Sequence, residues 1–175
     1  MANITVHRWI WAWDFDKEEE WLNDMAAQGW ALDGIGFCTY HFRSCEPGEY
    51  MVRLELLDGS IHMQKNREYI TFLEETGVEV VGNWLKWVYF RKKTSEGGFD
   101  LFSDIDSRIR HLGRICRLFI ILALANCSAA LNAMTNRFAA PFSIFNMLCI
   151  LMLAYGVMQI RKKKNALQRE RFLRE

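Results

Sequence analysis

The sequence predicts an α+β domain followed by a two-helix transmembrane hairpin. Three observations predict this class: two long apolar runs near the C-terminus, opposite net charge in the two halves of the chain, and alternating strand and helix patterns over the first ninety or so residues. The predicted divisions are a cytosolic α+β domain (1–93), a linker (94–103), a basic amphipathic juxtamembrane helix (104–117), two transmembrane helices (118–136 and 138–160) and a basic cytosolic tail (161–175).

The two apolar runs are long enough to cross a bilayer. Residues 118–136 and 138–160 carry no charged side chain, and Arg137 separates them. A bilayer core of ~30 Å needs about 20 helical residues. A buried soluble hairpin is the alternative, but the preceding domain is too small to cover two such helices. We therefore expect two membrane spans.

Basic residues flank both predicted spans and set their orientation. The residues expected to contact anionic lipid headgroups are Arg108, Arg110, Arg114, Arg117, Arg161, Lys162, Lys163 and Lys164. Because positive charge gathers on the cytoplasmic side, we expect a multi-pass protein of the cell membrane with both termini in the cytoplasm. The first residues lack a basic region followed by an apolar one, so no signal peptide is expected.

Small and polar residues within the spans predict how the helices pack. Ala125, Ala129 and Ala133 recur every fourth residue, which permits close approach of a neighbouring helix. Asn132 and Asn146 have side chains able to hydrogen-bond across such a pair. We expect these residues to serve helix packing or oligomer contacts.

Charge and motif content exclude several classes of function. Residues 1–107 carry ten Lys and Arg against nineteen Asp and Glu, whereas residues 108–175 carry twelve against two. An acidic domain is repelled by phosphates, so direct nucleic-acid binding is not expected. The five cysteines show no CxxC spacing and the four histidines are scattered. We therefore expect no metal, no cofactor and no enzymatic activity.

Strand and helix patterns alternate through the first domain. Asp16 with Glu19 indicates the start of the first helix, and Gly29 and Gly77 indicate the ends of the first and second. The run Glu18–Glu20 is interpreted as a solvated first turn rather than an acid/base cluster. The predicted strands and second helix are Ile4–Trp13, Trp30–Phe42, Glu49–Leu57, helix Arg67–Thr76, Val78–Gly82 and Leu85–Arg91.

The two halves of the domain match at a constant offset of 48 residues. Matched pairs are Trp21 with Tyr69, Gly29 with Gly77, Gly34 with Gly82, Tyr40 with Val88, and Phe42 with Phe90. Two β-α-β halves predict a ferredoxin-like split βαβ sandwich (βαββαββ), with one antiparallel sheet and helices on one face.

Aromatic residues suggest an interaction surface. Trp9, Trp11 and Trp13 alternate along the first predicted strand and would share one sheet face, to which Trp87 and Tyr89 would add. Exposed patches of this kind mark binding sites. The alternative is that the tryptophan face is the core covered by helices, since alternation does not say which face is covered.

Four segments resemble a known family. They are WAWDFDKEEEWLNDMAAQGWAL (11–32), EPGEYMVRLEL (46–56), EETGVEVVGNWLKWVYFRK (74–92) and LFSD (101–104). In this order they resemble the bacterial membrane-protein family catalogued as domain of unknown function 2812. The resemblance implies no catalytic residues. It implies a link to PadR-type transcriptional repressors, with which family members are often encoded.

The sequence therefore predicts a non-enzymatic, membrane-anchored regulatory or interaction module. Its partners are expected to be the lipid bilayer and a cytosolic protein, for which the resemblance implies a PadR-type repressor, with homo-oligomers as a further possibility. One alternative is a membrane sensor of a small amphiphilic ligand. Another is an accessory subunit of a membrane transporter complex.

Overall fold

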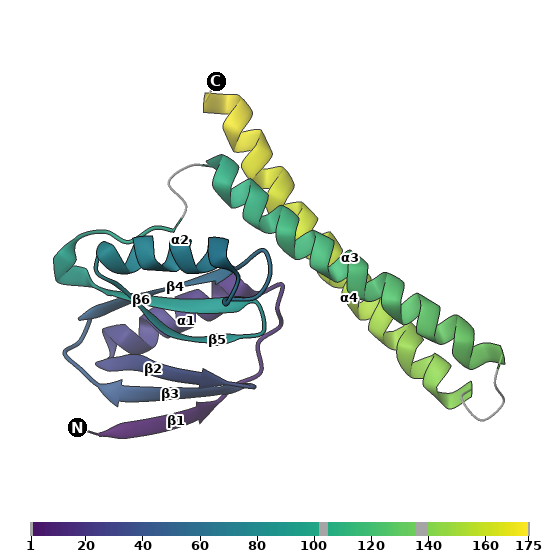
Figure 1. The fold of residues 1–175 in the computed structure, drawn as a ribbon, viewed down its shortest axis with the longest axis horizontal. Coiled ribbons are helices and arrows are strands. Elements are labelled where there is room, and N and C mark those ends of the chain that lie inside the picture. Colours follow the sequence, from purple (N-terminus) through teal and green to yellow (C-terminus); the bar gives the residue numbers. More distant parts are fainter. Residues whose placement is uncertain (1, 102–104, 136–139, 175) are drawn as a thin grey trace. The chain divides into compact units, whose positions relative to one another are not determined.

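The computed structural model describes residues 2–101, 105–135 and 140–174, and the chain divides into two compact units, residues 1–103 and 104–175 (Figure 1). The second unit is an antiparallel pair of helices. The elements are β1 (Asn3–His7), α1 (Phe15–Ala27), β2 (Trp30–Gly36), β3 (Thr39–Ser44), β4 (Tyr50–Leu56), α2 (Gln64–Glu75), β5 (Val78–Trp84), β6 (Trp87–Lys93), the short 3-10 helix η1 (Thr94–Glu96), α3 (Ile105–Thr135) and α4 (Ala140–Arg174). The predicted α+β class with a C-terminal hairpin of apolar helices is confirmed.

The strands form two antiparallel sheets rather than the single sheet expected. Their orders are β1-β3-β2 and β4-β6-β5. The segment Trp30–Phe42, expected to be one strand, is folded back on itself by a two-residue turn at Phe37 and Cys38. The turn was missed because neither residue is the Gly or Asn typical of tight hairpins. The order is therefore βαβββαββ, and the ferredoxin-like detail is not confirmed.

The 48-residue match is a structural repeat. Residues 3–44 and 50–93 each form a β-α-β-β unit with the same strand order, here called the first and second repeat. Each has a register shift at the same place, before Gly34 and before Gly82. Gly29 and Gly77 follow the two helices with φ of 88° and 85°, a conformation that favours glycine.

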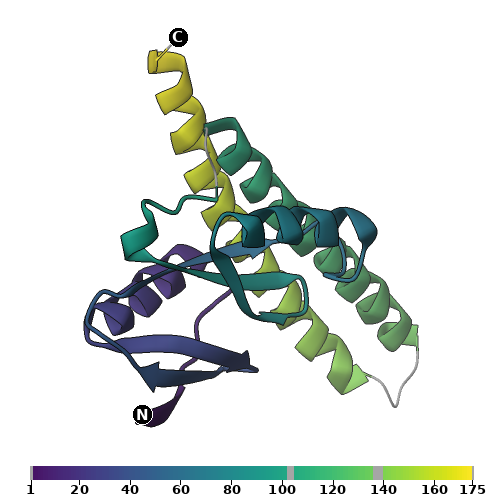
Figure 2. The same ribbon diagram turned by 60° about the vertical axis from the view of Figure 1, so that its left-hand side comes forward.

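The two repeats stack in the same sense. α1 lies between the two sheets, and α2 covers the far face of the second sheet (Figures 1 and 2). The core around α1 contains Leu22, Leu32, Tyr40, Phe42, Val52, Leu54 and Tyr89. The core under α2 contains Leu57, Ile70, Val78, Val88, Phe90 and Phe99. The second sheet is therefore buried on both faces.

Side chains of α1 also hydrogen-bond to the outer edge of β4. The amide of Asn23 donates to the carbonyl of Val52 (3.0 Å) and accepts from its N–H (2.9 Å). Oε2 of Glu19 accepts from the N–H of Leu54 (2.9 Å). Backbone groups at a sheet edge otherwise pair with water or with another chain, so α1 closes this edge.

A buried carboxylate joins the layers. Oε1 of Glu18, on α1, accepts hydrogen bonds from the phenols of Tyr40 on β3 (2.7 Å) and Tyr89 on β6 (2.6 Å). Glu18 is only 7% exposed, so the expectation of a solvated first turn is wrong for this residue. Burial raises the pKa of Glu18, while the two phenols act to lower it. Burial and the carboxylate also raise the pKa of both tyrosines.

The helix start and the exit from the second repeat differ from expectation. α1 begins at Phe15, with Asp14 rather than Asp16 at its N-cap, and the Asp14 carboxylate pairs with Lys17 Nζ at 2.8 Å. Within the predicted linker, Phe99 is buried in the core under α2. The sequence also predicts a helix start at Ser103, with Asp106 three residues later, and Ser103 lies outside the described residues.

The second unit is a pair of helices that run side by side (Figures 1 and 2). α3 is continuous from Ile105, so the predicted juxtamembrane and first transmembrane helices are one helix. Both helices are long and apolar enough to cross a membrane. An ion pair joins the guanidinium of Arg171 on α4 to the carboxylate of Asp106 on α3 at 2.9 Å. The buried apolar residues include Leu112, Ile115, Cys116, Phe119, Ala130, Ala133, Leu153 and Ile160.

Replacing Tyr89 by Phe should destabilise the first unit by about 1–3 kcal/mol, because a buried carboxylate loses one of its two donors. Tyr40→Phe should have a similar effect. The measurement is urea unfolding of the full chain in mild detergent, followed by tryptophan fluorescence. Tyr50→Phe is the matched control: Tyr50 is equally buried, but its hydroxyl accepts from Arg43 at 3.2 Å and holds no carboxylate. Equal losses in all three variants would contradict the prediction.

Replacing Glu18 by Gln should change how stability depends on pH. Because the folded-state pKa of Glu18 lies above its usual 4.5, its contribution to stability is fully present below that pH and is lost as pH rises through the folded-state pKa. The unfolding free energy of Glu18→Gln should therefore gain on that of the unchanged protein between acidic and neutral pH, by about 1.4 kcal/mol per unit of pKa shift. Parallel pH profiles would refute this.

Candidate interaction surface

The three tryptophans of the predicted interaction face lie on a connection rather than on a strand. β1 ends at His7, and the chain from residue 8 to residue 14 leads to α1. The backbone N–H of Arg8 donates to the carbonyl of Cys38 at 3.1 Å. The Arg8 guanidinium lies 4.6 Å from the centre of the Trp21 ring, a cation–π contact. These contacts fix the start of the connection against the first repeat.

The aromatic rings of this connection contact one another in series. Trp11 stacks on Trp13 with ring centres 4.8 Å apart, and Trp9 meets Trp11 edge to face at 5.3 Å. The series continues through Phe37, whose ring centre lies 6.0 Å from that of Trp9 and 5.5 Å from that of Trp84. Trp13 is buried, so the exposed rings are held by one that is anchored. Contacts within the first unit therefore hold these exposed rings in place.

Five large apolar side chains of this region are exposed. They come from the connection and from the two hairpin turns, with exposed fractions between 39% and 77%. We call them the aromatic patch: Trp9, Trp11, Phe37, Trp84 and Leu85. Isolated exposed apolar residues are ordinary, but a cluster in ring-to-ring contact is typical of a binding surface.

The repeat places an apolar residue at the same turn position twice. Phe37 and Leu85, 48 residues apart, are each the first residue of a two-residue hairpin turn. Leu85 has a φ of 54°, in the left-handed region, and is 77% exposed. A leucine there gains no burial and costs about 1–2 kcal/mol relative to right-handed backbone. Neither burial nor the backbone conformation therefore favours a leucine at this position.

The structure brings together only part of the predicted interaction face. Trp9 and Trp11 are exposed, but Trp13 and Tyr89 are buried and Trp87 packs on Phe15 at 5.5 Å. The helix-covered face of the first sheet carries Ile4 and Val6, even-numbered residues that strand alternation places on the face opposite the odd-numbered tryptophans. Sequence reasoning missed Phe37, Trp84 and Leu85. The apolar residues at equivalent turn positions could have indicated two of them.

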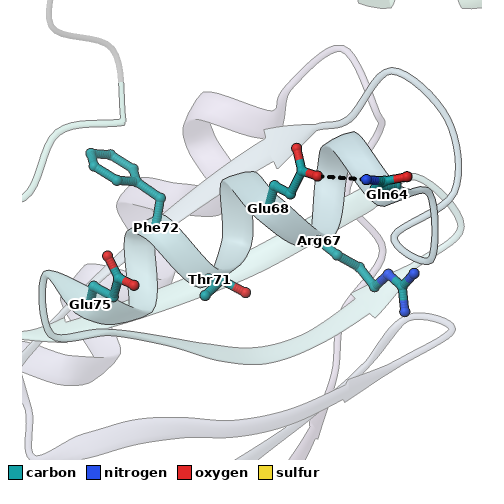
Figure 3. Close-up of a pocket in the computed structure, with 6 residues that line it drawn as sticks. All are labelled: Gln64, Arg67, Glu68, Thr71, Phe72 and Glu75. Atoms are coloured by element: carbon teal, nitrogen blue, oxygen red, sulfur yellow. Dashed lines mark hydrogen bonds between the residues drawn. The ribbon is translucent and has the colours of Figure 1, made fainter.

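The outer face of α2 is a second exposed surface. Figure 3 shows Gln64, Arg67, Glu68, Thr71, Phe72 and Glu75 around a shallow hollow, and all of them belong to this one helix. Gln64 Nε2 donates to Glu68 Oε1 at 2.9 Å. Because one helix supplies every lining residue, the hollow has no opposing wall. Among the described residues, no group of three His, Cys, Asp or Glu could hold a metal ion.

The predicted packing residues of the spans fall on different sides of the helix pair. Ala133 is buried between the helices, whereas Ala125, Ala129 and Asn132 are exposed on the outside of the pair, and Asn146 is half-buried. The Asn132 amide donates to the carbonyl of Ser128 in its own helix at 3.0 Å. Ala125 and Ala129 therefore lie outside the seam of this hairpin, and Ala133 is the stripe residue that lies within it.

The predicted headgroup residues lie along the charged ends of the two helices. Arg108, Arg110, Arg117, Arg161 and Lys162 are exposed. Arg114, Lys163 and Lys164 are half-buried along the seam. These ends also hold the Asp106–Arg171 ion pair, so the helices stay associated where the apolar runs stop.

Fold and surface together define an α+β protein with two helices able to cross a membrane and with an exposed aromatic cluster. The model of the family described as protein of unknown function (DUF2812) matches residues 14–124, and the chain belongs to this family. No match was found among curated proteins. None was found among solved structures.

Replacing Leu85 by Asn should stabilise the first unit by about 0.5–1 kcal/mol, because Asn tolerates the left-handed backbone and leucine does not. Leu85→Ala is the control, since alanine removes the apolar side chain but keeps the backbone penalty. Thermal or urea unfolding of the full chain in detergent measures both. A loss of stability in Leu85→Asn would show that the side chain is needed for folding.

Proposed function

We propose that this protein is a non-enzymatic, membrane-anchored interaction module that binds a cytosolic protein through the aromatic patch. The carrying observation is the patch itself: five large exposed apolar side chains from three segments of the chain, of which the four aromatic ones are in ring contact. Aromatic residues of this kind supply most of the binding energy in protein interfaces. Rings already fixed against one another lose little conformational entropy on binding.

The anchor is the helix hairpin, proposed to cross the cell membrane twice with both termini in the cytoplasm. α3 has 31 residues and α4 has 35, or about 46 and 52 Å of helix. A hydrocarbon core of ~30 Å leaves at least ten residues of each helix outside it. Because basic residues gather at one end of each helix, these surplus turns belong on the cytoplasmic side.

Only some of the basic residues lie within reach of headgroups on a straight helix. Arg108 lies nine residues before Arg117, about 13 Å along the axis. The headgroup layer on each side is about 5–7 Å thick. With Arg117 at the edge of the hydrocarbon core, Arg108 and Arg110 extend into the cytosol on a helix normal to the membrane. The proposed headgroup contacts are thus Arg114, Arg117 and Arg161 with the lysines that follow it.

The proposed partner is a PadR-type transcriptional repressor, held at the membrane and away from its operator. The family resemblance supports this class of partner. The acidic surface of the first unit supports it too, since residues 1–103 carry seventeen Asp and Glu against ten Lys and Arg, and a repressor's DNA-binding face is basic. Charge would speed the encounter, and the aromatic patch would supply most of the affinity.

The test is binding of a PadR-type repressor encoded beside the gene to the full chain in lipid nanodiscs. The patch variant carries Trp9→Ser, Phe37→Ser and Leu85→Asn. We expect it to weaken the Kd by more than tenfold, since hot-spot residues each contribute above ~1 kcal/mol. Phe72→Ser is the matched control, because Phe72 is as exposed as Phe37 but lies on α2.

Two results would reject this proposal. One is absence of binding at low salt, which would remove the repressor as a partner. The other is equal affinity of the patch variant and the unchanged protein, which would place the contact elsewhere on the surface. Retained binding that disappears on raising the salt would indicate the acidic surface instead, since screening weakens exposed charge pairs over about 10 Å.

The alternative functions stay hypotheses. An amphiphile sensor would show a ligand-dependent thermal shift that the patch variant loses. An accessory transporter subunit would depend on the exposed stripe of Ala125 and Ala129 rather than on the aromatic patch. Substitution of Ala125 and Ala129 therefore separates the transporter role from the other two functions, and the ligand-dependent thermal shift separates the sensor from the interaction module.

A further inference from the structure

The outer edge of β1 presents backbone hydrogen-bonding groups. In the ladder with β3, the carbonyl of Ala2 accepts from Ser44, and the N–H of Arg8 donates to Cys38. Along an antiparallel strand, the backbone N–H and C=O groups of successive residues point to opposite sides, so those of the even-numbered residues bond to β3. The N–H and C=O groups of Asn3, Thr5 and His7 therefore point away from the sheet. No element of the described chain pairs with this edge.

The repeat shows that an equivalent edge is closed. Residues of β3 correspond to residues of β6 that lie 48 positions later in the chain. The residues that face them, on β1 and β4, correspond with an offset of 49, so Asn3 corresponds to Val52 and Thr5 to Leu54. The backbone groups of Val52 and Leu54 are those bonded by Asn23 and Glu19 of α1. β1 begins the first repeat in the stack, so no preceding helix of the described chain closes its edge.

A helix from another copy lacks the groups to close this edge in the same way. In α2, the positions that correspond to Glu19 and Asn23 are occupied by Arg67 and Thr71. Arg67 has no carboxylate like that of Glu19, which accepts from the N–H of Leu54. Thr71 has no amide like that of Asn23, which both donates to and accepts from Val52. Head-to-tail stacking of copies would also extend without limit. A two-fold arrangement closes the edge with a single partner.

We propose that β1 pairs with β1 of a second copy, antiparallel about a two-fold axis at Thr5. In this register Thr5 faces Thr5 and Asn3 faces His7, and each facing pair exchanges two backbone hydrogen bonds. Ile4 lies beside Val6 of the other copy on the helix-covered face, where both side chains are half-buried already. Threonine pairs and β-branched pairs are favourable across strands.

The composition of β1 fits self-pairing. The strand Asn-Ile-Thr-Val-His has no Asp, Glu, Lys or Arg, so an acidic domain can approach its copy here without like charges meeting. It also lacks the proline, lysine and bulge with which edge strands avoid pairing. Five residues bury less than the roughly 1,000 Å² of a stable soluble interface. A common membrane raises the effective concentration and makes the weak contact sufficient.

Cysteine cross-linking in native membranes tests the register. Thr5→Cys places two thiols in a facing pair with Cα atoms ~5.5 Å apart, inside the range of a disulfide. Asn3→Cys is the matched control, because the two copies of residue 3 would lie about 14 Å apart. Under mild oxidation we expect the Thr5→Cys dimer band to exceed that of Asn3→Cys and of the unchanged protein by about tenfold or more. Co-expression of Asn3→Cys with His7→Cys should restore a strong band.

A second variant separates pairing from folding. Thr5→Pro removes an N–H that points away from β3, so the ladder within the copy stays intact. We expect the dimer fraction in nanodiscs or detergent, counted by single-molecule photobleaching, to fall at least threefold, with unchanged thermal unfolding. Equal cross-linking of Thr5→Cys and Asn3→Cys, or an unchanged dimer fraction in Thr5→Pro, would overturn the pairing. The aromatic-patch variant should cross-link normally at Thr5→Cys, so the two proposals fail separately.

Discussion

One oxygen atom joins the layers of the first unit. Oε1 of Glu18 accepts from a tyrosine of each sheet, so α1 is fixed to both. A buried carboxylate with fewer donors is costly, and apolar packing alone is not directional. Two donors from opposite sides therefore set how the repeats stack, and with them the positions of the two hairpin turns that carry Phe37 and Leu85. The aromatic patch depends on a contact that none of its own residues makes.

The two repeats share a plan but differ in what covers them. The face of the second sheet that meets α1 carries Leu54 and Tyr89, whereas the equivalent face of the first sheet carries Thr5 and His41. The side chains of Thr5 and His41 hydrogen-bond to each other at 3.0 Å on an exposed surface. A polar outer face ends the stack, as terminal repeats do in larger repeat proteins. This polar outer face does not favour the packing of a further repeat or of a second copy against it. The edge of β1, in contrast, presents backbone groups that another strand can bond.

Sequence reasoning found the features that are local. Gly29 and Gly77 predict the helix ends because a left-handed residue is needed there, and the apolar runs predict the long helices. It missed the turn at Phe37, which lacks the usual turn residues and forms because β2 and β3 pair. It also missed the burial of Glu18, whose partners lie 22 and 71 residues away. The patch was only partly found, because strand alternation was extended past His7.

The burial of Phe99 extends the core of the second repeat beyond its last strand. The chain from β6 to the hairpin passes through the core under α2 before it reaches Leu101, and the hairpin begins four residues later at Ile105. Phe99 is buried in this core and Leu101 packs against it, so the second repeat continues eight residues past the end of β6 at Lys93. A truncation at the end of β6 would therefore remove apolar side chains from under α2, and the domain boundary lies after Leu101 rather than at the last strand.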